Sequence, residues 1–83
     1  MTLQVRYFAS IREALGASET VETPVGGTIG ELRDRLIATS PQHAQALARG
    51  RALRCALNQT LCAESASLAD GDEVAFFPPV TGG

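Results

Sequence analysis

The chain has 83 residues, of which 45% are hydrophobic, and a formal net charge of −2. This length suits one globular domain with a modest core, and the hydrophobic content is not that of a disordered chain. The negative charge argues against binding of nucleic acid through its phosphates. No apolar run approaches the ~20 residues that are needed to cross a bilayer, and no signal peptide is recognisable. We therefore expect a cytoplasmic protein.

The N-terminal segment is predicted to form two paired strands around a short helix. The side chains of residues 3–9 are predicted to alternate between the two faces of a strand, one of which is buried and the other of which carries Phe8. The residues expected on the buried face are Leu3, Val5 and Tyr7. A capping box over Ser10–Glu13 predicts a short helix at residues 11–15. The β-branched residues at 20–23 predict a second strand that pairs with the first.

A longer helix is predicted to follow. The pattern Thr28–Glu31 is a second capping box, and apolar residues then recur at helical spacing. They are Ile29, Leu32, Leu36 and Ile37, whereas Arg33, Asp34 and Arg35 are expected on the solvent side. Pro41 ends the helix because the residue before a proline disfavours helical geometry. Residues 42–49 are expected to add one or two turns, and no role is evident for residues 42–52.

The second half of the chain is predicted to be mainly strands. Alternation over residues 53–57 predicts a third strand, and a tight turn at Asn58–Gln59 leads into a short fourth strand at 60–63. A glycine turn at 68–72 precedes the last strand, 73–77. Strands, then a helix, then more strands indicate an α+β fold: one mixed sheet of four to five strands with the long helix packed across a face.

The two cysteines, Cys55 and Cys62, form no C-x-x-C motif, and a single histidine cannot complete a zinc site with them. We therefore expect two free, mostly buried thiols in a reducing compartment, and no metal site.

All 7 basic residues are arginine. The absence of lysine excludes chemistry that needs a lysine amine, such as a Schiff base.

The C-terminal segment suggests a delivery arm. Pro78–Pro79 ends the last strand and stiffens the root of the tail, Val80-Thr81-Gly82-Gly83. The six residues from Pro78 onward could span ~20 Å if extended, which would reach into a partner's active site. The two glycines place no Cβ near the terminal carboxylate, so a narrow tunnel could admit the carboxylate for activation as an acyl adenylate. The alternative is an ordinary flexible terminus.

The first and last strands each carry a phenylalanine on the face opposite the predicted core. Phe8 and Phe77 would therefore form an exposed aromatic pair near the root of the tail, which is typical of a docking surface. Two alternatives are that a loop covers the pair, or that the two faces are inverted.

Three segments resemble the small, sulfur-carrying subunit of molybdopterin synthase, the MoaD type. They are Asp70–Gly83, Val5–Glu13 and Asn58–Leu61. The similarity follows the chain from end to end and implies a β-grasp (ubiquitin-like) domain over residues 1–79 with a flexible sulfur-carrying tail at 80–83.

The resemblance also implies a mechanism in which an adenylating enzyme of the MoeB type uses MgATP to join AMP to the Gly83 carboxylate. A sulfurtransferase system then converts it to a thiocarboxylate. The tail enters the large synthase subunit, of the MoaE type, and gives its sulfur to cyclic pyranopterin monophosphate to build the dithiolene of molybdopterin. Two carriers on a dimer of large subunits form a heterotetramer, and the carrier itself binds no cofactor.

By position, the resemblance makes Gly83 the sulfur-bearing residue and Gly82 its neighbour in the tunnel. It places Phe8, Leu61 and Phe77 in the apolar surface that meets both partners, and Arg12 at a basic position beside it. For Arg12 the alternative is a solvated helix charge. Catalytic acids and bases are expected on the partners.

Three rival functions stay open at this point. A sulfur carrier for another pathway, such as that of thiamine, would share the fold and the tail chemistry. A ubiquitin-like modifier would be joined through Gly83 to lysines of other proteins. A β-grasp binding module would have an inert tail, and deletion of Gly82–Gly83 would then have no effect.

Overall fold

The computed structural model describes residues 1–24 and 26–79. In these residues the elements follow the order strand, helix, strand, helix, helix and three strands. They are β1 (Thr2–Tyr7), α1 (Ala9–Leu15), β2 (Ser18–Glu22), α2 (Ile29–Ile37), α3 (Pro41–Ala46), β3 (Arg54–Leu57), β4 (Thr60–Cys62) and β5 (Glu73–Phe77).

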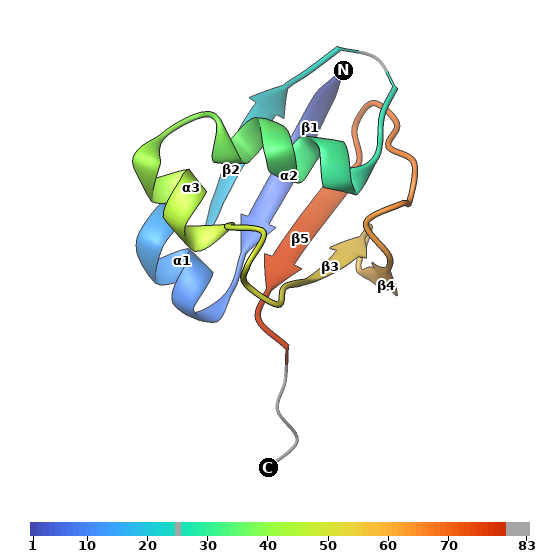
Figure 1. The fold of residues 1–83 in the computed structure, drawn as a ribbon. Helices are drawn as coiled ribbons and strands as arrows, with labels where there is room; N and C mark the ends of the chain where they lie inside the picture. The colour runs from blue at the N-terminus through green and yellow to red at the C-terminus, as the bar shows by residue number, and fades with distance from the viewer. Residues whose placement is uncertain (25, 80–83) are drawn as a thin grey trace.

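The five strands form one mixed sheet in the order β2-β1-β5-β3-β4. The central strands β1 and β5 run parallel, and the other neighbours are antiparallel. The three helices lie on one face of this sheet, and α2 crosses it (Figure 1). The predicted α+β class with a mixed sheet is therefore confirmed, as is the pairing of the first two strands.

The core fills the space between the sheet and the helices. Its fully buried larger side chains are Leu3, Val5, Tyr7, Ile11, Ile29, Leu36, Leu47, Val74 and Phe76. The strand residues among them come from alternate positions of β1 and β5, as a sheet with one buried face requires. The prediction for the buried face of the first strand is confirmed.

The N-cap role predicted for Thr28 is confirmed, whereas the Glu31 carboxylate meets the Thr28 hydroxyl at 3.3 Å in place of its backbone N–H. The Thr28 hydroxyl accepts a hydrogen bond from the Glu31 backbone N–H at 3.3 Å and so satisfies a free donor of the first turn of α2. The turn at Asn58 and Gln59 is also confirmed, with φ of 49° and 70°. Two successive positive φ values match the twist of a two-residue hairpin.

The predicted capping box at Ser10 is wrong. Helix α1 starts earlier, at Ala9, and its N-cap is Phe8, whose side chain makes no cap hydrogen bond. The Phe8 backbone N–H donates to the Phe76 carbonyl at 3.2 Å, so hydrogen bonding to β5 keeps the chain extended as far as Phe8. The chain must therefore turn at once, and Ala9 does so with φ of 54°.

The helix predicted at residues 42–49 also lies earlier in the chain. Ser40 is the N-cap of α3, since its hydroxyl accepts from the His43 backbone N–H at 3.1 Å, and Pro41 occupies the first turn. His43 Nε2 lies 2.7 Å from a Glu19 oxygen, which also accepts from the Tyr7 hydroxyl at 2.7 Å. Burial and Glu19 raise the pKa of Tyr7. This network joins α3 to β1 and β2.

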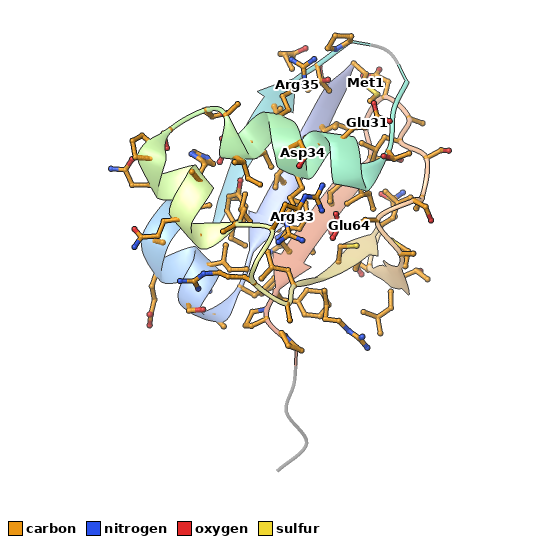
Figure 2. All side chains as sticks on the ribbon, in the orientation of Figure 1. Met1, Glu31, Arg33, Asp34, Arg35 and Glu64 are labelled. Atoms are coloured by element: carbon orange, nitrogen blue, oxygen red, sulfur yellow. The ribbon has the colours of Figure 1, made fainter. Side chains whose placement is uncertain are left out.

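The expectation that Arg33 faces solvent is wrong, because Arg33 is only 3% exposed. Its Nε donates to the Leu47 carbonyl at 2.8 Å and Nη2 to the Ala48 carbonyl at 2.6 Å, and Nη1 pairs with Glu64 at 2.8 Å. Figure 2 shows Arg33 pointing from α2 toward Glu64. The segment after α3, for which the sequence suggested no role, thus supplies carbonyls that satisfy a buried guanidinium.

Candidate functional site: an apolar patch at the end of β1 and β5

Two phenylalanines meet where the central strands end. Because β1 and β5 are parallel, Phe8 and Phe77 reach the same edge of the sheet. Their ring centroids lie 6.5 Å apart at an interplanar angle of 86°, a favourable edge-to-face arrangement. Phe8 remains 39% exposed and Phe77 is half-buried. The predicted aromatic pair is therefore present on the outer face, with Phe8 the more exposed of the two rings, and within residues 1–24 and 26–79 no loop covers Phe8.

The pair belongs to a larger apolar surface, which we call the apolar patch. A shallow hollow of about 480 Å³ is lined by Phe8, Ala9, Phe77, Pro78 and Pro79. A second hollow, of about 370 Å³, shares Phe77 and Pro79 with the first and extends to Leu61 and Arg54. Leu61 is 64% exposed. The patch consists of Phe8, Ala9, Leu61, Phe77, Pro78 and Pro79, and so unites three of the predicted partner-binding residues.

Arginines border the patch. The guanidinium carbon of Arg6 lies 5.7 Å from the centre of the Phe8 ring, within range of a cation–π contact. Arg6 also lies 3.7 Å from a Glu73 oxygen. An apolar centre with a charged margin is the usual anatomy of a protein interface. Neither Arg6 nor Arg54 was predicted to belong to the site, although Arg6 shares with Phe8 the outward face of the first strand.

The structure does not bring Arg12 into the patch. Arg12 is exposed on α1 and does not line either hollow. Its backbone carbonyl accepts a hydrogen bond from the Gly16 N–H at 2.8 Å, at the C-terminal end of the helix. Its predicted contact with a partner stays a prediction.

The predictions for Val80, Thr81, Gly82 and Gly83 lie outside the described residues. What the structure does show is the position of the last residues before them. Pro78 and Pro79 follow β5 directly and line the apolar patch. A protein that covers the patch would therefore also contact the point from which the chain continues toward Gly83.

Neither cysteine lines the two hollows of the patch, although both share a third hollow with Leu61. Cys55 is buried, Cys62 is half-buried, and both thiols are free. Burial and the neighbouring Cys62 raise the pKa of Cys55 to about 11. Residues 1–24 and 26–79 hold no group of three or more His, Cys, Asp and Glu side chains placed to bind a metal ion. None of the described helices is long and apolar enough to cross a membrane.

A five-stranded mixed sheet with helices across one face is the β-grasp architecture of ubiquitin-like proteins. Comparison with known proteins agrees with this class: a model of the ThiS family matches residues 5–83. The chain therefore belongs to the ThiS family.

One curated relative is the molybdopterin synthase sulfur carrier subunit of Escherichia coli. It is 46% identical over 81 residues, which cover 98% of this chain and 99% of that protein. Identity at this level over nearly the full length of both chains confirms the resemblance that the sequence motifs indicated.

Two solved structures share the fold. SAMP1 from Haloferax volcanii superposes with a TM-score of 0.78 at 27% identity, covering 100% of both chains. The complex of subunits 1 and 2 of the molybdopterin-converting factor from Helicobacter pylori contains a chain that superposes with a TM-score of 0.68 at 28% identity, again over 100% of both chains.

Proposed function

We propose that this chain is the sulfur carrier subunit of molybdopterin synthase. Its working group is the Gly83 carboxylate, which is adenylated, converted to a thiocarboxylate, and used to donate sulfur to cyclic pyranopterin monophosphate. The observation that carries the proposal is the apolar patch at the root of the Gly-Gly tail, in a chain that matches a sulfur carrier subunit over nearly its full length.

The chemistry requires activation of the carboxylate. A free carboxylate is a poor acceptor for a sulfur nucleophile, so MgATP first converts it to a mixed anhydride with AMP and releases pyrophosphate. Sulfur at the oxidation level of sulfide, supplied through a sulfurtransferase system, then attacks the carbonyl, displaces AMP and leaves the thiocarboxylate. After the sulfur has passed to the substrate, water supplies the oxygen that returns Gly83 to a carboxylate, and the carrier can be recharged.

The apolar patch suits docking. Its six residues present aromatic, aliphatic and proline surface, and Arg54 is the charged residue that joins them in lining the hollows. Aromatic side chains, phenylalanine among them, are enriched in the cores of protein interfaces. We assign the acid–base steps to the partner proteins, and to this chain the delivery of its terminus.

The proposed partners are an adenylating enzyme of the MoeB type, a sulfurtransferase, and a large synthase subunit of the MoaE type, with a heterotetramer as the final assembly. The Helicobacter pylori structure, in which subunits 1 and 2 form a complex, supports the last pairing. If one patch receives both the adenylating enzyme and the large subunit, the two must bind in turn. Alternating binding would let the carrier leave one enzyme before it visits the other.

A second candidate function is protein modification. The observation that favours it is the fold shared with SAMP1, a chain that another structure describes as small archaeal modifier protein 1. Isopeptide-linked adducts of Gly83 in cell extracts would support this function.

A sulfur carrier of the thiamine pathway is distinguished by its partner. Recovery of a thiazole synthase in place of a large molybdopterin synthase subunit would indicate that carrier.

The proposed function is tested by deleting Gly82 and Gly83. The shortened chain should fold and still bind the large subunit, because the patch is intact, but a reconstituted synthase should form no dithiolene product from cyclic pyranopterin monophosphate. Undiminished product formation by the shortened chain would overturn the carrier function.

A further inference from the structure

Cys55 and Cys62 face each other across a hairpin. They are direct partners in the antiparallel pairing of β3 with β4, two positions from the Leu57–Thr60 pair that closes the turn. Direct partners on neighbouring strands project their side chains from the same face of a sheet. The two thiols therefore lie on one face, and Cys55 belongs to the core cluster against which Cys62 packs.

The backbone distance suits a covalent link. The pair that closes a two-residue turn is a hydrogen-bonded pair, and since the two kinds of pair alternate, Cys55–Cys62 is also hydrogen-bonded, with Cα atoms about 5.5 Å apart. Disulfides join Cα atoms at about 4.4–6.8 Å. The Cys55 thiol already points toward the opposite strand, since its Sγ lies 3.3 Å from the Cys62 carbonyl oxygen.

One of the two thiols can be reached from solvent. Strand β4 is an edge of the sheet, and Cys62 is half-buried. Both cysteines line a hollow of about 500 Å³ together with Arg54, Leu61 and Glu64. Cys55 is buried and has a raised pKa, so little of it is thiolate at neutral pH. Cys62 is therefore the thiol that an external reagent meets first.

We propose that Cys55 and Cys62 are a reversible oxidation site that forms an intramolecular disulfide with a low-molecular-weight disulfide such as oxidised glutathione. The Cys62 thiolate attacks one glutathione sulfur, which forms a mixed disulfide and releases one glutathione thiol. Cys55 then gives up its proton and attacks the Cys62 sulfur, which releases the second glutathione. Two protein thiols are oxidised, one disulfide is reduced, and the two thiol protons end on the released glutathione molecules.

The oxidation site is independent of the carrier chemistry. It uses neither Gly83 nor any residue of the apolar patch. Leu61 of the patch lines the same hollow as the two cysteines, but its side chain leaves β4 on the face opposite to Cys62, because successive strand residues alternate. The link would brace an edge hairpin from its inner side and leave the outer side as it is. The link would lie on an edge strand with Cys62 only half-buried, and exposed disulfides are the more easily reduced ones, so we expect ready reduction.

The test incubates the folded full-length chain with oxidised glutathione, alkylates any remaining thiols, and measures intact mass. The expected product is a monomer that has lost two hydrogen atoms and takes up no alkylating agent, and dithiothreitol should reverse the change. Trypsin cleaves after Arg54 and leaves both cysteines in one fragment, 55–83. Fragmentation should then yield no backbone ions between positions 55 and 62.

Two variants locate the steps. Cys55→Ser should stop at a stable glutathione adduct on Cys62, whereas Cys62→Ser should react many times more slowly, because Cys55 is buried. The proposal is overturned if the wild-type chain keeps both thiols alkylatable, accumulates a stable glutathione adduct, or links two chains together. Each of these outcomes is read on the folded wild-type chain and so does not depend on how the variants fold.

Discussion

The ring of Phe8 meets the ring of Phe77 edge to face, with 6.5 Å between the ring centres, at the edge where the two parallel strands end. We predict that Phe8→Ala and Phe77→Ala each weaken binding to the large synthase subunit by about tenfold or more, as expected for aromatic residues at the centre of an interface. The measurement is the dissociation constant from titration calorimetry. Thr20→Ala, an exposed change on β2, is the matched control and should leave binding unchanged.

Leu61 provides a second test of the patch from a different strand. Leu61 is 64% exposed, so Leu61→Asp should alter the free energy of unfolding by no more than about 0.5 kcal/mol. The same change would place a carboxylate in an apolar interface and should weaken docking by at least about tenfold. Urea unfolding and calorimetry separate the two effects. Unchanged affinity would remove Leu61 from the docking surface.

Arg33 should matter for stability and not for docking. We predict that Arg33→Ala lowers the free energy of unfolding by about 3 kcal/mol, because three backbone carbonyls lose their donor and Glu64 loses one of its two arginine partners. The neighbouring Arg35→Ala, at an exposed position of the same helix, is the control and should change stability by less than about 0.5 kcal/mol. Equal effects of the two substitutions would contradict the structural role of Arg33.

Glu64 should make stability fall in acid. Burial opposes ionisation of this carboxyl, but hydrogen bonds and charge from Arg49 and Arg33 outweigh it, so the pKa lies below its ordinary value of 4.5. A lowered folded-state pKa means that the stabilisation is complete above the unfolded-state value and is lost as pH falls through the folded-state value. Urea midpoints should therefore drop as the pH is lowered below 4.5. Glu64→Gln should show a shallower pH dependence.

Much of the fold could be predicted because local patterns and tertiary structure agree. The last strand is found at Glu73–Phe77 as predicted, since alternation defines its body and Pro78 its end. The outward face of Phe8 and Phe77 followed from the same alternation.

Two features could not be predicted, because distant residues decide them. Helical spacing places Arg33 next to two exposed charged residues. The carbonyls that accept hydrogen bonds from its guanidinium belong to residues 14 to 18 positions later in the sequence. The start of α1 depends on a hydrogen bond from Phe8 to β5, which no local capping pattern reveals. The border of arginines around the patch likewise depends on strand order.

The central claim concerns the terminal carboxylate, and the intact mass of the chain made together with its adenylating enzyme and sulfurtransferase tests it most directly. We predict a mass gain equal to the replacement of one oxygen by sulfur, located at Gly83, and no gain in a variant that lacks Gly83. A persulfide on Cys55 or Cys62 would add a whole sulfur atom and is therefore distinguishable. An unchanged terminus, with active enzymes and ATP consumed, would contradict the account.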